Sequence, residues 1–151
     1  MFSFFRKPKM SCLSLAETLA PKFTRMAIHQ YDSEVEALGE NSWIAESARR
    51  TSQIASKREW VLYCLAGYIN GCRASMGEND IHFRFGHLFL QICGRNLVEQ
   101  SIFPTESEFE KLGQDRTTEY LGAITSDDPK ESMNRVAKAF LINAGCNTND
   151  I

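Results

Sequence analysis

The chain has 151 residues, of which 43% are hydrophobic and 24% are charged, and its formal net charge at pH 7 is −2. This length fits one domain with a single core, and the composition is that of a globular protein. The near-neutral charge excludes the strongly basic class of nucleic-acid-binding proteins, so we expect no specific nucleic-acid partner.

No apolar segment is long enough to cross a bilayer, which needs about 20 consecutive apolar residues. The N-terminal stretch MFSFFRKPK places its apolar residues before its basic ones, the reverse of a signal peptide. Its composition is typical of bacterial or phage proteins. We expect a basic and aromatic tail over residues 1–10, one helical domain over 11–146 and a flexible tail over 147–151.

Helix signals begin with a capping box, in which Ser14 and Glu17 bond free backbone N–H groups at a helix start. Pro21 is expected to end or kink this first helix, because proline lacks an N–H and its ring clashes with the preceding turn. A second helix is then predicted to start at Pro21 and to run toward Leu38, with Gly39 as its stop.

A short surface helix with a narrow apolar face is predicted from Asn41 or Ser42 to about Gln53. The segment that follows, from Trp60 to Met76, is apolar on most sides of a helix. It predicts a central helix, over about residues 57–76, with other helices packed around it. The side chains expected in the core are Trp60, Leu65, Ile69, Phe85, Leu88, Phe89 and Phe140.

Three further helix starts follow in the sequence. Asn79 or Asp80 is expected to cap a strongly apolar helix, and Thr105–Glu108 has the pattern of another capping box. Asp128 followed by Pro129 is typical of a cap and a first-turn proline, and Gly145 is expected to close that last helix. The sequence therefore predicts an all-α, single-domain bundle of about six helices.

Gly67 and Gly71 form a Gly-x-x-x-Gly pattern within the central helix. Each glycine costs about 1 kcal/mol of helix propensity relative to alanine, so something is expected to offset that cost. We expect a close helix crossing inside the monomer. The alternatives are a homodimer contact and a groove that holds a ligand or a partner segment.

Charged residues cluster in three places. The basic cluster predicts an exposed face paired with neighbouring acids, with a nucleic-acid patch as the alternative; its members are Arg49, Arg50, Lys57 and Arg58. The two acidic segments predict either solvated helix faces or a docking surface for a basic partner. The acidic candidates for an interaction are Glu34, Glu36, Glu40, Glu106, Glu108 and Glu110.

Neither a metal site nor a cofactor is expected. Glu78 and His82 are one isolated pair at helical spacing, while His82 and His87 lie on different faces of a helix. The five cysteines are odd in number and lack a Cys-x-x-Cys spacing, so we expect free thiols in a reducing cytoplasm. No local motif of a nucleophile, a phosphate-binding loop or a zinc site is present.

The leading hypothesis for function is a non-enzymatic module that binds another protein, as an adaptor, an immunity protein or antagonist, or a chaperone does. It would act through the acidic helix faces, and a homodimer is possible. The alternative is a regulator that binds a small molecule in an apolar pocket between the Trp60 and Phe85 helices. No catalytic residue is assigned.

Overall fold

The structure, a computed structural model, describes residues 10–37, 42–77, 79–124, 128–147 and 149. These residues form six helices and no strand, which confirms the all-α prediction. The helices are α1 (Cys12–Glu36), α2 (Trp43–Arg50), α3 (Gln53–Met76), α4 (Asp80–Glu99), α5 (Glu106–Ala123) and α6 (Pro129–Asn143). Glu40 lies outside the described residues, and so do residues 1–9, 148, 150 and 151 of the predicted tails.

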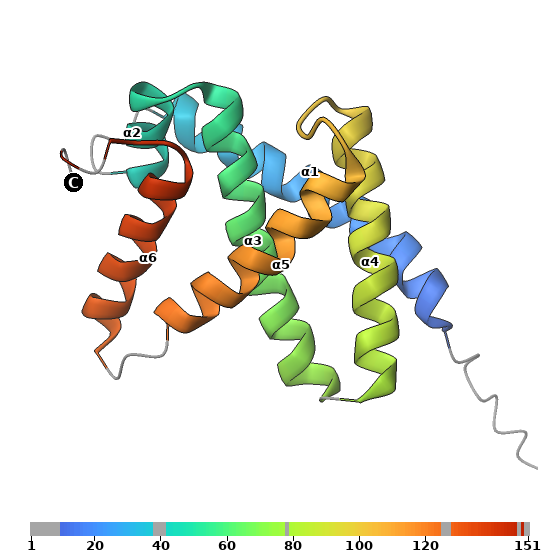
Figure 1. The fold of residues 1–151 in the computed structure, drawn as a ribbon. Coiled ribbons are helices and arrows are strands. Elements are labelled where there is room, and N and C mark those ends of the chain that lie inside the picture. Colours follow the sequence, from blue (N-terminus) through green and yellow to red (C-terminus); the bar gives the residue numbers. More distant parts are fainter. Residues whose placement is uncertain (1–9, 38–41, 78, 125–127, 148, 150–151) are drawn as a thin grey trace, which may run out of the picture.

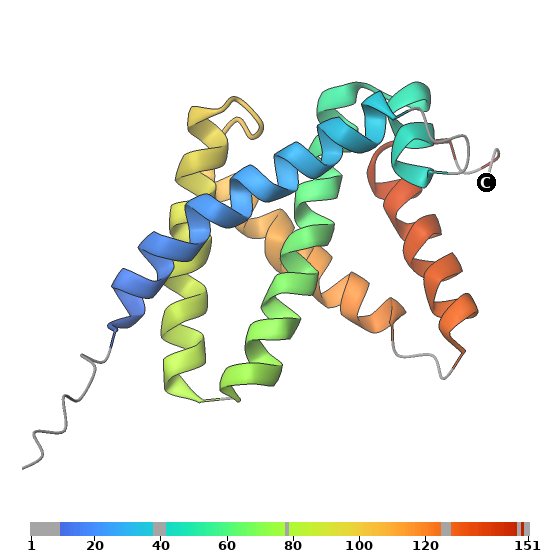
Figure 2. The same cartoon turned by 180° about the vertical axis from the view of Figure 1, so that it is seen from behind.

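Helices α3 and α4 form an antiparallel pair at the centre of the molecule. Figure 1 shows α5 crossing one face of this pair, and Figure 2, the reverse view, shows α1 crossing the other face. α1 packs mainly against α4, and α5 packs mainly against α3. α2 and α6 contact α3 near its N-terminal end, so they cover only that part of it.

Most of the helices begin at a residue whose side chain caps the first turn. The side chains of Ser42, Asn79, Thr105 and Asp128 accept backbone N–H groups of the turn that follows, as the sequence predicts. The first cap differs from the prediction. Ser11, not Ser14, accepts the Ser14 N–H at 3.1 Å, so α1 starts one turn earlier than predicted.

α1 continues through Pro21, so the prediction of a second helix starting there is wrong. Ala16 and Ala20 before the proline, and Phe23 and Ala27 after it, are all buried in the core. This tertiary packing favours one long helix over the local preference for a break. The Pro21 carbonyl also accepts bonds from the side chains of Thr24 and Arg25 nearby.

The junction between α2 and α3 lies earlier than the sequence suggested. α2 ends at Arg50 because Thr51 leaves the helical conformation, and Ser52 caps the new helix by accepting the Ala55 N–H. α3 therefore has 24 residues, from Gln53 to Met76. Gly77 ends it with a φ of 77°, a left-handed conformation that favours glycine.

The N-terminal half of α3 is the centre of the core, but its C-terminal half is not. Val61, Leu62, Leu65 and Ala66 are buried, whereas from Gly67 onward most side chains are exposed or half-buried. The prediction of a helix covered on all sides is thus correct only for the first half. Of the seven expected core residues, the three half-buried ones are Trp60, Ile69 and Leu88.

A buried polar network joins α3 to α5. Glu59 is 3% exposed and accepts hydrogen bonds from Tyr120 Oη and, at 3.1 and 3.2 Å, from Arg116 Nε. Arg116 also pairs with Glu119, which accepts a bond of 2.8 Å from Asn143 of α6. A buried carboxylate needs such partners, so this network fixes how α5 and α6 lie on α3.

The close helix crossings occur at glycines other than the predicted ones. A Cβ added to Gly94 of α4 would lie 3.1 Å from Phe109 Cδ1 of α5, and one added to Gly113 would lie 3.1 Å from Leu65 Cδ2. Both glycines are buried. The missing side chains thus allow α5 to approach α4 and α3 closely.

We expect Gly94→Leu to lower the free energy of unfolding by about 1–3 kcal/mol, because the new side chain would separate α4 from α5. Urea denaturation followed by circular dichroism measures this loss. Asn134→Leu, on the exposed face of α6, is the control and should change stability by less than about 0.5 kcal/mol. Equal stability of the two variants would contradict the crossing.

Burial raises the pKa of Glu59 above its ordinary value of 4.5, although the bonds from Tyr120 and Arg116 act in the opposite direction. Between the two pKa values the folded protein holds a proton that the unfolded chain has lost. Stability therefore falls as pH rises through this interval, and the contribution is constant above the folded-state pKa.

We expect the free energy of unfolding of the wild type, measured relative to Glu59→Gln, to fall as pH rises from about 4.5 and then to level off. The glutamine keeps an acceptor for Tyr120 but does not titrate. Urea titrations of both proteins across this range test the sign. A difference that instead grows with pH would mean that the pairing with Arg116 outweighs desolvation.

Candidate functional site

The uncovered C-terminal half of α3 is flanked by two hollows on opposite faces of the α3–α4 pair. One is an open groove toward α1, and the other is a more enclosed cavity toward α5. Tyr68 and Cys72 of α3 line both. The Tyr68 ring also stacks on Phe89 of α4, with centroids 4.8 Å apart and 9° between the planes.

The groove arises because the C-terminal half of α1 lies beside the start of α3 and the two helices diverge from there. Trp60 Nε1 donates to the Ala27 carbonyl at 2.9 Å, which holds the two helices together near the start of α3. Figure 2 shows α1 leaning away toward α4 as α3 continues to its end. The groove between them is mainly apolar, with hydroxyl groups only on Tyr68 and Ser75, and it is lined by Phe23, Met26, Cys64, Gly67, Tyr68, Gly71, Cys72, Ser75 and Met76.

Gly67 and Gly71 lie exposed on the floor of this groove. No atom beyond the helix itself lies within 4 Å of a Cβ added to either residue. The prediction of a close crossing inside the monomer is therefore wrong for the described residues. α1, the nearest helix on this face, is drawn toward α4 by its buried apolar stripe and does not fill the space.

A separate hollow lies toward the C-terminal end of α1 and shares no lining residue with the groove. It is lined by Trp60 of α3 and by His29, Gln30, Ser33 and Glu34 of α1. On α3 the spacing of Trp60, Cys64, Gly67, Gly71 and Ser75 places all five on one stripe. This stripe covers 15 residue steps of helix, about 22 Å at 1.5 Å per residue.

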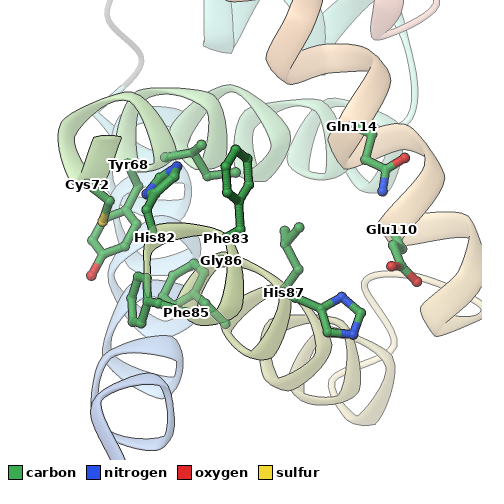
Figure 3. A pocket seen from close by; sticks show the side chains of 12 residues that line it. Tyr68, Cys72, His82, Phe83, Phe85, Gly86, His87, Glu110 and Gln114 are labelled. Atoms are coloured by element: carbon green, nitrogen blue, oxygen red, sulfur yellow. The ribbon is translucent and has the colours of Figure 1, made fainter. Parts of the chain in front are cut away.

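The cavity on the other face has a volume of about 290 Å³ and lies between α3, α4 and α5. Its walls are mainly aromatic and aliphatic, with Phe85 and Phe89 buried and Phe83 exposed at its edge. Figure 3 shows His82 and Phe83 side by side at one end, and His87 with Glu110 at the other. The sequence alternative of an apolar pocket between these helices thus has a matching hollow.

A further hollow of about 240 Å³ adjoins the His82 end. It shares Ile69, His82 and Phe83 with the cavity, and its other lining residues are Asn70, Arg73, Thr117, Thr118 and Leu121. Two of these lining residues each carry a buried polar atom that has no hydrogen-bond partner in the described part of the chain. These atoms are His82 Nδ1 and Thr117 Oγ1.

The cavity brings together residue types that nucleophilic catalysis uses, namely Cys72, two histidines and Glu110. Burial raises the pKa of the Cys72 thiol, the largest cause being desolvation. A nucleophilic cysteine needs a lowered pKa, because the thiolate is the reactive form. On the groove side, burial likewise raises the pKa of Cys64 to about 12. Both thiols are therefore held in the protonated form, which is the less nucleophilic one.

The acidic candidates do not form one surface. Glu34 and Glu36 are exposed at the C-terminal end of α1, beside α2, while Glu106 and Glu108 lie in the first turn of α5 beside α4. Acidic side chains in a first turn interact favourably with the helix dipole, and this explains Glu106 and Glu108 without a binding partner. Glu110 is half-buried and lines the cavity.

The predicted basic cluster is divided between α2 and α3 rather than sharing one helix. Arg50 pairs with Glu46 at 2.6 Å, and Lys57 pairs with Asp32 at 2.7 Å. Arg58 donates to the Ile102 carbonyl. Lys57 thus links α3 to α1, and Arg58 links α3 to the segment after α4. Arg50 and Lys57 have the expected acidic partners, whereas Arg58 bonds a carbonyl instead.

All five cysteines are free thiols. In the part of the chain that the structure describes, no group of three or more His, Cys, Asp or Glu side chains is placed to hold a metal ion. None of the described helices is both long and apolar enough to cross a membrane. The chain matches no protein-family model, no curated protein and no solved structure.

Because Gly67 and Gly71 face open space, we expect Gly67→Ala and Gly71→Ala each to raise the free energy of unfolding by about 0.5–1 kcal/mol through helix propensity. Thermal and urea denaturation of the monomer measure the gain. Gly94→Ala is the matched comparison, since its Cβ would meet Phe109, and it should show no such gain. A clear loss at Gly67 would mean that another helix packs against it.

Proposed function

We propose that the protein is a module that binds another protein, and that the groove between α1 and α3 receives one helix of that partner. The observation that carries this proposal is the pair of uncovered glycines at the groove floor. Each lowers helix propensity by about 1 kcal/mol, and no contact among the described residues compensates for it. A partner helix lying over them would approach the α3 backbone closely.

The chemistry of the groove defines the partner. Its floor is apolar, and the flexible side chains of Met26 and Met76 border it, as in surfaces that adapt to different apolar helices. Glu34 is exposed in the separate hollow beside Trp60, toward the C-terminal end of α1. The partner helix would present small and apolar residues at i, i+4 and i+7, and a lysine or arginine that faces Glu34.

Free thiols at all five cysteines support a cytoplasmic location for this binding, because disulfides are rare in reducing compartments. Two of these thiols, Cys64 and Cys72, line the groove itself.

A phage-displayed library of helical peptides tests the proposal. Peptides are selected on the wild type and then measured on a Gly67→Leu/Gly71→Leu double variant, which fills the groove without a clash. Amphipathic peptides with a basic residue should bind the wild type and lose about tenfold or more in affinity on the double variant. Asn134→Leu, which adds a leucine far from the groove, should bind like the wild type.

Two outcomes would overturn the proposal. Peptides that bind all three proteins equally would place the binding surface elsewhere. Self-association of the wild type in sedimentation equilibrium, abolished in the double variant, would make the occupant a second copy of this chain rather than another protein. Glu34→Gln should weaken only peptides that carry the basic residue.

A further inference from the structure

We propose that the cavity between α3, α4 and α5 is a binding site for a small amphipathic carboxylic acid. The apolar body would lie between the aromatic side chains of the cavity, and the carboxylate would lie in the adjoining hollow, which shares Ile69, His82 and Phe83 with the cavity. This site is on the opposite face of the α3–α4 pair from the groove and shares only Tyr68 and Cys72 with it, so its ligand would not occupy the space of the proposed partner helix.

The size of the cavity suits a body of about two rings. An apolar cavity of about 150 Å³ holds a benzene ring, and this one has about 290 Å³. Tyr68, Phe85 and Phe89 supply aromatic rings on its wall, and the ring centroids of Phe85 and Phe89 are 5.5 Å apart. Gly86 lies on the same wall and leaves room, because a Cβ there would meet nothing within 4 Å.

The polar groups place the head group at one end. His82 is only 9% exposed, yet its Nδ1 has no hydrogen-bond partner in the described structure, and the same holds for the buried Thr117 Oγ1. Leaving such atoms unpaired is unfavourable, so two residues that carry them beside one hollow point to a ligand that bonds both.

The choice of a carboxylate follows from which groups meet there. A threonine hydroxyl and a histidine Nδ1–H can donate hydrogen bonds, and Arg73 and Asn70 on the same wall donate as well. The N-terminal end of α4, next to His82, adds positive potential. Asp80 in that first turn is exposed to solvent, and Glu110 lies at the far end of the cavity. An acceptor-only anion is therefore favoured over an ammonium group.

Isothermal titration with three compounds that share one body tests this inference. They are 2-naphthoate, 2-naphthalenemethanol and 2-naphthylmethylamine, which differ in the charge of the head group. We expect 2-naphthoate to bind most tightly and the amine to bind about tenfold more weakly. Amide shifts in two-dimensional NMR spectra should be confined to the start of α4, the C-terminal half of α3 and α5.

Two variants test the binding of the apolar body and the binding of the head group separately. Gly86→Leu should fill the cavity and abolish binding of all three compounds. Thr117→Val keeps the shape of the side chain but removes the unpaired hydroxyl, so 2-naphthoate should bind about fivefold more weakly while the unliganded protein becomes at least as stable as the wild type. Asn134→Leu should bind all three compounds like the wild type.

Tighter binding of the amine, an unchanged affinity of Thr117→Val for 2-naphthoate, or no binding of any compound at millimolar concentration would each overturn the inference. Because the groove variants Gly67→Leu and Gly71→Leu do not enter this experiment, its result is separate from that of the peptide selection. If Gly86→Leu does not fold, Thr117→Val and the order of the three compounds still decide the question.

Discussion

The whole architecture depends on covering the N-terminal half of α3. Val61, Leu62 and Leu65 face one buried cluster shared with α1, α4 and α5, while Ala66 faces a second cluster shared with α5 and α6. An apolar helix in water must be covered on every side, and the other five helices do this over about three turns. Glu59 lies in the same buried part of α3, because Tyr120 and Arg116 of α5 donate hydrogen bonds to its carboxylate. Apolar packing has no preferred direction, so these directional bonds orient α5 on α3.

α3 is longer than the surface that covers it, and this mismatch creates both hollows. α2 and α6 reach only its start, and α1 leaves it to pack on α4. The last two and a half turns, from Gly67 to Met76, therefore remain bordered by groove on one face and cavity on the other. The aromatic stack of Tyr68 on Phe89 keeps this half of the helix attached to α4.

The glycines show how one residue type takes different roles in one bundle. Gly94 and Gly113 allow close crossings, because a side chain at either would meet a buried neighbour. Gly67 and Gly71 have the spacing usually associated with a crossing, yet they face open space. Spacing places two glycines on one stripe of a helix, but whether another helix lies over that stripe depends on where the rest of the chain goes.

Local sequence determined the helices of this protein. Caps such as Asn79, Thr105 and Asp128 act on N–H groups within three residues, so the starts they mark can be identified without knowing the fold. The apolar spacing within α3 and α4 likewise placed Leu65, Phe85 and Phe89 in the core. The pattern also suggested an apolar pocket between these two helices, although not the residues that line it.

Tertiary structure decided the rest, because the deciding contacts join residues far apart in the chain. Glu59 meets Arg116 and Tyr120 across 57 and 61 positions, a pairing that no local pattern indicates. Packing on α4 carried α1 through Pro21 and away from Gly67, which turned an expected crossing into a groove. His82 and Thr117 belong to different helices, and only the approach of α5 to the α3–α4 pair places both beside the same hollow. The sequence thus determined which segments are helical and apolar, and the packing of those segments determined which of their faces stayed uncovered.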